Sequence, residues 1–296
     1  MFSMQVGLVG LGKMGSGMAL RLAKDGHEVV GMDVSEKSRG RAQEAGAIAV
    51  GSLSELVDRL EHPRTVWVML PPGEITRNAI AQLAGLLSDG DLVVDGGNSD
   101  FRDAPANRDA LSARGVRFVD IGVSGGQWGW KNGYGLMAGG SEEDFAHVVP
   151  LLDSLSASGG HRRVGDVGSG HLVKAIHNGV QYAILQAYAE GYALLDSHPE
   201  VDTLAGIAAW QEGSSIRSWL LEQLLEAIRD NPTLDNVSTS VSDSGMGRWT
   251  AEEAVRLGIP TPVLTAALYA RFASRADGIA NKVLVAARGR VGGQTS

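Results

Sequence analysis

One short segment carries several side chains suited to proton transfer and hydrogen bonding. The sequence HLVKAIHNGVQY runs from His171 to Tyr182. Offsets of three, four and seven residues return to one side of an α-helix. At about 100° per residue, its polar side chains would share an arc of about 140°. These are His171, Lys174, His177, Asn178, Gln181 and Tyr182. An amine, two imidazoles and two amides in that arc are suited to acid–base chemistry on a polar ligand.

A polar stripe of this kind has two interpretations. Most polar helix faces are simply solvated. Solvated faces usually carry many Glu, Lys and Arg residues in oppositely charged pairs, whereas Lys174 is the single fixed charge of this stripe. We therefore interpret the stripe as a hydrogen-bonding surface, and its role in a site depends on the other motifs.

A glycine-rich motif near the start of the chain predicts a dinucleotide site. It follows the apolar run Met4–Val9 and opens a helical pattern, which is the context that a GxGxxG sequence requires. The first glycine permits a tight turn, the second lets a pyrophosphate approach, and the helix N-terminus supplies N–H groups. The predicted cofactor-binding residues of the loop are Gly10, Leu11, Gly12, Lys13, Met14 and Gly15.

An acidic residue after the second predicted strand favours NAD. Asp33 lies about 20 residues beyond the glycine motif, where a carboxylate binds the adenine ribose hydroxyls. It would repel a 2′-phosphate, and the next basic residues are Lys37 and Arg39. We expect NAD as cofactor, with NADP as an open alternative.

Two further loops follow predicted strands at the edge where open α/β sheets bind ligands. Leu70 and Pro71 are expected to pass over the dinucleotide. Asn98, in the sequence DGGNS, is expected to approach nicotinamide or substrate. The alternative for each loop is a plain turn.

The elements that must position these residues fall into two groups. Strand-like runs alternate with helical patterns up to about residue 165, which predicts an α/β, Rossmann-like, doubly wound parallel sheet. These runs cover residues 4–9, 27–35, 47–50, 65–70, 91–98 and 116–121. Residues 166–296 are expected to form an all-helical domain for substrate binding and dimerisation. Its helical segments are predicted at 169–197, 201–210, 214–228, 250–257 and 261–287.

Composition excludes several classes of protein. The chain has 296 residues, enough for two domains, and a formal charge of -8 argues against a nucleic-acid partner. It contains no cysteine and its seven histidines are scattered, so we expect no metal site. No apolar run reaches about 18 residues, so we expect no membrane span and a cytoplasmic protein.

A third motif and the stripe together carry a family resemblance. The segment DIGVSGG, residues 120–126, offers a hydroxyl and bare backbone amides as a cradle for a carboxylate. With GLVGLGKMG and GHLVKAIHN, it resembles the β-hydroxyacid dehydrogenases. Within that group the chain is most similar to the shorter 6-phosphogluconate dehydrogenases, along nearly its whole length. The matching segments are GGNSDFRDA, SGGQWGWKNGYGLMAGG, HNGVQYAILQAYAEGYALL, DSGMGRWTAEEA and ALYARFASR.

The resemblance implies a reaction and a set of roles. Oxidative decarboxylation of 6-phosphogluconate to a ketopentose phosphate would proceed with Lys174 as general base, as part of gluconate utilisation and the pentose phosphate pathway. The same family pairs through its helical domains, so we expect a homodimer or homotetramer. The catalytic group would include His177 and Asn178 beside Lys174. The sugar acid would be held by Asn98, Ser124, Gly125, Gly126, His177 and Asn178, and its distal phosphate by Tyr182 and Arg271.

Two departures from the family keep other functions open. The family has a glutamate that supplies a proton at the position of Gln181, and an amide cannot do so near neutral pH. The short form usually has an acidic residue at the position of Met246. A non-decarboxylating β-hydroxyacid dehydrogenase acting on another acid is therefore the second hypothesis. A catalytically silent NAD-binding protein is the third, although it would have no need of Lys174.

Overall fold

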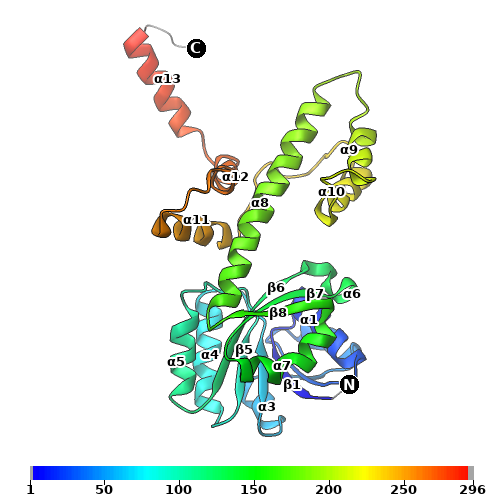
Figure 1. Ribbon diagram of the computed structural model, residues 1–296, viewed down its shortest axis with the longest axis vertical. Helices are drawn as coiled ribbons and strands as arrows, with labels where there is room; N and C mark the ends of the chain where they lie inside the picture. Colours follow the sequence, from blue (N-terminus) through cyan, green and yellow to red (C-terminus); the bar gives the residue numbers. More distant parts are fainter. Residues whose placement is uncertain (1–2, 293–296) are drawn as a thin grey trace. The chain divides into compact units, whose positions relative to one another are not determined.

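The computed structural model describes residues 3–292, and its first part is built on one sheet (Figure 1). Eight strands form it in the order β3-β2-β1-β4-β5-β6-β7-β8, and every pair from β3 to β6 is parallel. The predicted Rossmann-like, doubly wound fold is thereby confirmed. The strands are β1 (Gln5–Val9), β2 (Glu28–Met32), β3 (Ile48–Val50), β4 (Thr65–Val68), β5 (Leu92–Asp95), β6 (Arg117–Ser124), β7 (Tyr134–Gly139) and β8 (Ser156–Gly165).

Helices cover both faces of this sheet and enclose two apolar cores. The helices are α1 (Lys13–Lys24), α2 (Glu36–Glu44), α3 (Leu53–Asp58), α4 (Glu74–Leu86), α5 (Ala104–Ser112), the short η1 (Gly126–Trp128) and α6 (Gly129–Asn132), and α7 (Glu142–Leu155). One core gathers Met18 and Leu22 of α1 with Leu151 of α7. The other gathers Leu83 of α4 with Leu111 of α5. Central strands buried on both faces explain the nearly continuous apolar runs of the sequence.

The last two strands were not predicted. β7 pairs with β6 in the antiparallel direction, and β8 then pairs with β7 in parallel. Their sequences, YGLMAG and SASGGHRRVG, are rich in glycine and poor in β-branched residues. They therefore lack the local signal by which the first six strands were recognised. The antiparallel pair of β6 and β7 is thus an addition to the predicted parallel sheet.

The remainder of the chain is helical, as predicted. Its helices are α8 (Ser169–Asp196), α9 (Thr203–Gln211), α10 (Trp219–Asp230), α11 (Met246–Leu257), α12 (Pro262–Ala273) and α13 (Ile279–Gly292). Three details differ from the prediction. The segment 261–287 is two helices that are interrupted at residues 274–278. α10 begins at Trp219, after the predicted start at residue 214, and α11 begins at Met246, before the predicted start at residue 250.

The chain divides into two compact units between His177 and Asn178, within α8. The first unit therefore holds the sheet and the first turns of α8. The predicted domain boundary at residue 165 lies at the end of β8 and stays a prediction. Within residues 3–292, no helix combines the length and the apolar character that a membrane crossing requires.

Candidate active site

The glycine motif forms the turn between β1 and α1. Gly10 has φ +95°, and a Cβ atom there would lie 2.4 Å from the carbonyl oxygen of Met69, so only glycine is accommodated. Gly12 is exposed and a Cβ atom would meet nothing within 4 Å. The N–H groups of the first turn of α1 face this open side without intrahelical acceptors. The loop residues Gly10 to Gly15 thus provide the anion-binding helix entry that a pyrophosphate requires.

Asp33 lies directly beside this loop, at the end of β2. Its Oδ2 accepts the Leu11 N–H at 2.8 Å and its Oδ1 accepts the Ser35 N–H at 2.8 Å. Each carboxylate oxygen keeps a second lone pair for a ribose hydroxyl. Arg39 donates from Nη1 to the carbonyl oxygens of Asp33 and Val34, at 2.8 and 3.1 Å. The Asp33 carboxylate at the end of β2 is therefore available to an adenine ribose, and the Arg39 guanidinium is held by the backbone next to it.

The two other predicted loops occupy the same edge of the sheet. Leu70 and Pro71 follow β4, and the carbonyl of Pro71 accepts a hydrogen bond from Thr76 at 2.7 Å. Asn98 follows β5 in a left-handed conformation, with φ 54°. Its amide clamps the loop to β6, because Nδ2 donates to the Val123 carbonyl at 3.0 Å and Oδ1 accepts the Val123 N–H at 2.8 Å. One amide proton and one lone pair remain for a ligand.

Lys174, His177 and Ser124 come together at the end of β6. Nζ of Lys174 lies 3.4 Å from Nδ1 of His177, and Nε2 of His177 lies 3.3 Å from Oγ of Ser124. The lysine is only 5% exposed. Its stem rests on Gly122, where a Cβ atom would lie 2.4 Å from the Lys174 Cβ. The predicted carboxylate cradle, Ser124 with Gly125 and Gly126, thus adjoins the amine.

Burial changes the acid–base behaviour of this amine. Desolvation lowers the pKa of Lys174 to about 8. A substantial fraction of Lys174 is therefore neutral near physiological pH, which a general base requires.

Three buried residues around the start of α8 were not predicted as part of the site. Asp120 of β6 accepts the N–H groups of Gly168 and His171, at 2.6 and 2.8 Å, and so caps the first turn of α8. His171 in turn lies 3.3 Å, Nε2 to Oδ2, from Asp95 at the end of β5, and both side chains are fully buried. Asp95 and Asp120 lie within apolar strands of the sequence. This position could have indicated a buried polar partner, because a carboxylate is rarely buried without one.

In the second unit, Asn178 and Tyr182 each contact residues of the segment that leads into α11. Nδ2 of Asn178 donates to the sulfur of Met246 at 3.2 Å. The Tyr182 hydroxyl accepts the Ser244 N–H at 3.2 Å. Gln181, on the same helix, is half-buried.

Arginines gather beside Tyr182. The guanidinium carbon of Arg271 lies 3.7 Å from the centre of the Tyr182 ring. Asp243, which was not predicted, pairs with Arg248 and Arg275, each at 2.9 Å, and its own side chain is 1% exposed. Arg271 donates to the carbonyl oxygen of the neighbouring Ser242 at 2.7 Å, so two paired guanidinium groups and one further guanidinium accompany the single Asp243 carboxylate. This part of the second unit is thus suited to a phosphate.

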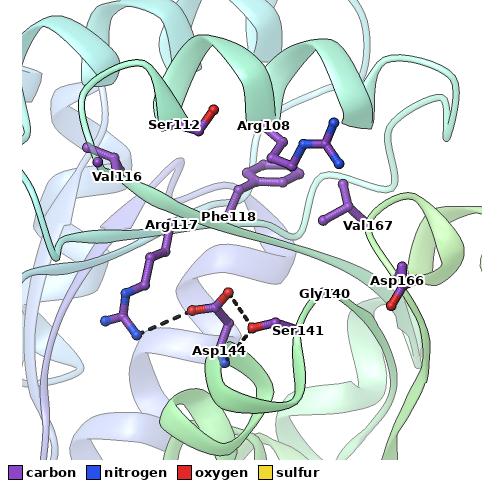
Figure 2. Close-up of a pocket in the computed structure, with 11 residues that line it drawn as sticks. Arg108, Ser112, Val116, Arg117, Phe118, Gly140, Ser141, Asp144, Asp166 and Val167 are labelled. Atoms are coloured by element: carbon purple, nitrogen blue, oxygen red, sulfur yellow. Dashed lines mark hydrogen bonds and ion pairs between the residues drawn. The ribbon is translucent and has the colours of Figure 1, made fainter.

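Two other features lie outside the predicted chemistry. A cavity of about 470 Å³ is found at the opposite end of β6 (Figure 2), and none of its lining residues is a predicted site residue. Two of its charged side chains pair with each other, because Arg117 lies 3.3 Å from Asp144. Among the described residues, no group of three His, Asp or Glu side chains is placed to hold a metal ion.

Comparison with known proteins supports the resemblance seen in the motifs. The NAD binding domain of 6-phosphogluconate dehydrogenase matches residues 5–168, and the C-terminal domain of the same enzyme matches residues 170–288. An NAD(+)-dependent, decarboxylating 6-phosphogluconate dehydrogenase from Haloferax volcanii is 40% identical, over 93% of this chain and 92% of its own length.

Two solved structures have the same fold. The 6-phosphogluconate dehydrogenase of Plasmodium falciparum, known with NADP+ and with 6-phosphogluconate, superposes with a TM-score of 0.83 at 27% identity. That match covers 97% of this chain and 65% of the Plasmodium chain. A 3-hydroxyisobutyrate dehydrogenase from Salmonella typhimurium superposes with a TM-score of 0.79 at 25% identity, covering 93% and 95% of the two chains. The class of enzyme predicted from the sequence, an NAD(P)-dependent oxidoreductase, is confirmed, and the chain belongs to the 6-phosphogluconate dehydrogenase family.

Proposed function

We propose that this protein catalyses the NAD-dependent oxidative decarboxylation of 6-phosphogluconate, or of a close sugar-acid analogue, to a ketopentose phosphate. The observation that carries the proposal is the buried Lys174, whose pKa is lowered to about 8 by burial and which adjoins His177 and Ser124. An amine at that pKa is suited to take the proton of an alcohol. The NAD-dependent Haloferax relative supports the choice of substrate and cofactor.

In the oxidation step, Lys174 removes the proton of the C3 hydroxyl while the C3 hydride leaves. Bound nicotinamide supplies the hydride acceptor, held by the Gly10–Gly15 loop, Asp33, Leu70, Pro71 and Asn98. Lys174 becomes an ammonium and C3 becomes a ketone. Asn98, Ser124, Gly125 and Gly126 orient the sugar acid through the donors and acceptors that their own contacts leave available.

In the decarboxylation step, the bond between C1 and C2 of the 3-keto acid breaks and carbon dioxide leaves. Its electron pair forms an enolate, which the Lys174 ammonium stabilises by donating a hydrogen bond at the C3 oxygen. The carbon that becomes C1 of the ketopentose must then take up a proton. Gln181 cannot supply one from its amide, so we propose that it positions a water molecule or the substrate.

Arg271 and Tyr182 of the second unit are proposed to contact the distal phosphate. Asn178 and His177 of α8 are proposed to contact the sugar acid. Arginine offers bidentate contact to phosphate oxygens. The cation excess around Asp243 supports this role, because Arg248 and Arg275 add positive charge beside Arg271.

The test follows NADH formation and carbon dioxide release with 6-phosphogluconate for wild type, Lys174→Ala and Gln181→Glu. We expect Lys174→Ala to lower kcat by about 10²–10⁴-fold, the usual contribution of general acid–base catalysis. Gln181→Glu should turn over at least as fast as wild type, because it restores a proton donor. Gln82→Glu is a matched control, since Gln82 is exposed on α4 and is not a proposed site residue.

A second candidate is a β-hydroxyacid dehydrogenase that stops at the keto acid. The carboxyl groups missing at Gln181 and Met246 favour it, as does the structural likeness to 3-hydroxyisobutyrate dehydrogenase. NADH formation from simple 3-hydroxy acids without carbon dioxide release would establish it. Loss of activity in Gln181→Glu on the true substrate would also favour it, whereas no turnover with any of these acids would indicate a silent NAD-binding protein.

A further inference from the structure

Four polar side chains from three elements are buried together beneath the helix turn that carries Lys174. Asp95 ends β5, Ser99 lies in the turn that follows, Asp120 lies within β6, and His171 lies in the first turn of α8. Their exposed fractions are 0%, 3%, 0% and 1%. A buried carboxylate persists only with a compensating charge or with hydrogen bonds. Asp120 has backbone hydrogen bonds at both oxygens, whereas Asp95 has the Gly97 N–H at 3.0 Å on one oxygen and His171 facing the other.

The pKa of His171 shifts in the opposite direction to that of an ordinary buried histidine. Burial alone would lower the pKa of His171, but the carboxylates of Asp95, Asp120 and Asp100 together raise it above its usual value. Burial alone would raise the pKa of Asp95, but His171 together with the hydrogen bond from the Gly97 N–H lowers it below its usual value. His27, also buried in this unit, behaves conventionally: burial lowers its pKa.

We propose that His171 is a positioning residue, an imidazolium that binds Asp95 and offsets the negative charge of Asp95 and Asp120 beneath Lys174. The pair joins the turn that presents Asn98 to the helix turn that presents Lys174. This inference rests on the proposed function, in which Lys174 is the base.

The expected consequence is a change in the acidity of Lys174. Without the imidazolium, two carboxylates would favour the ammonium form. In His171→Gln the acid limb of kcat/KM against pH should move upward by about one pH unit, since a nearby opposite charge shifts a pKa by about 1–3 units. The other ionisable groups that face this region are His177, beside the amine, and Asp100, which also acts on His171. Both stay unchanged in the variant.

The experiment compares wild type, His171→Gln, Asp95→Asn, the double variant and the control His27→Gln. The amide introduced by Asp95→Asn would keep an oxygen for the Gly97 N–H, so this substitution removes charge with little change of shape. We expect the double variant to return the acid limb toward wild type, and the control to leave it in place. KM for NAD should stay unchanged in the control, because His27 contacts neither the glycine loop nor the turn that presents Asn98.

A second readout needs no turnover. In ¹H–¹⁵N NMR of the free protein, the His171 ring should lose its second proton at a higher pH than an ordinary histidine, whereas the His27 ring should lose it at a lower pH. In Asp95→Asn the His171 titration should move to lower pH. A His171 ring in wild type that titrates at or below the ordinary histidine pH would overturn the proposal, as would an unmoved acid limb in a folded His171→Gln. If His171→Gln does not fold, the Asp95→Asn spectrum decides. If wild type does not oxidise 6-phosphogluconate, the proposed function fails. The NMR spectra then test the His171–Asp95 ion pair independently of activity.

Discussion

At the scale of single residues, the proposed chemistry depends on a lysine that is neutral at moderate pH. Only the neutral amine accepts a proton, so kcat/KM should rise with pH up to the pKa of Lys174, about 8, and level off above it. Below that value we expect a decline of about tenfold per pH unit, since kcat/KM reports the ionisation of the free enzyme. The measurement is the pH profile of NADH formation at low substrate concentration.

His177 is the control for this assignment, because its Nδ1 lies 3.4 Å from Nζ of Lys174 and imidazole also titrates near neutrality. His177→Asn should lower kcat but retain an acid limb near pH 8. If the acid limb of the pH profile disappears in His177→Asn, the titrating group is His177 and not Lys174.

Asp33 is the residue on which the cofactor preference depends. Asp33→Ala should reduce the ratio of kcat/KM for NAD over NADP by about tenfold or more, because the negative charge that repels a 2′-phosphate is lost. The same variant removes the acceptor of the Leu11 and Ser35 N–H groups. Asp33→Asn separates the two effects, since it removes the charge and keeps an acceptor. Unchanged discrimination in both variants would show that the ribose contact lies elsewhere.

The sequence indicated the reactive residues better than it indicated their supports. Lys174 and His177 were recognisable because helical spacing is local and is read directly from the chain. Asp95 and Asp120 were missed as partners of His171, because their contacts join strands to a helix about 50 to 75 residues away in the sequence. Such pairings depend on sheet order, which no single segment encodes.

At the scale of elements, the decisive contact is that of α8 on β6. Gly122→Ala would place a Cβ atom 2.4 Å from the Lys174 Cβ and 2.6 Å from the Gly170 carbonyl oxygen, so α8 must shift. We expect a loss of about 1–3 kcal/mol in the free energy of unfolding. Displacement of the amine should lower kcat by about 100-fold. Denaturant unfolding and steady-state kinetics measure the two effects.

Gly135→Ala is the control in the same sheet. A Cβ atom at Gly135 would meet the Ser124 Cβ at 3.7 Å, an ordinary contact, so stability and kcat should stay near wild type. Equal effects of the two substitutions would contradict the claim that close packing at Gly122 positions the lysine.

Strands were predictable where the sequence is a continuous apolar run. β4 and β5 are buried along their whole length and appear as such runs, whereas β8 is mostly half-buried or exposed and has none. The break between α12 and α13 escaped prediction because its residues, SRADG, interrupt the apolar period for less than two turns. Local pattern therefore found the strands with apolar runs, including the edge strand β3, and missed the glycine-rich strands β7 and β8.

At the scale of the whole molecule, the distribution of buried and exposed side chains on α8 bears on association. Its polar stripe is largely buried, with Lys174, Asn178 and Tyr182 each below 9% exposure, while Val180 and Ile184 on the other side are 43% and 37% exposed. Val263 of α12 is 68% exposed and lines a groove of about 350 Å³ with Ala183 and Ala187 of α8. Apolar surface of this kind marks protein contact sites.

We therefore predict a homodimer or homotetramer that buries this face of the second unit. Val263→Glu should place a charge in that contact and shift the protein toward the monomer, which light scattering after size-exclusion chromatography would measure. Val237→Glu is the control, because Val237 is similarly exposed, at 59%, in the segment between α10 and α11. A wild-type monomer, or equal dissociation by both variants, would contradict the prediction. Dissociation without loss of the folded state would show that the exposed face belongs to association, because a core residue replaced by glutamate would instead unfold the helices around it.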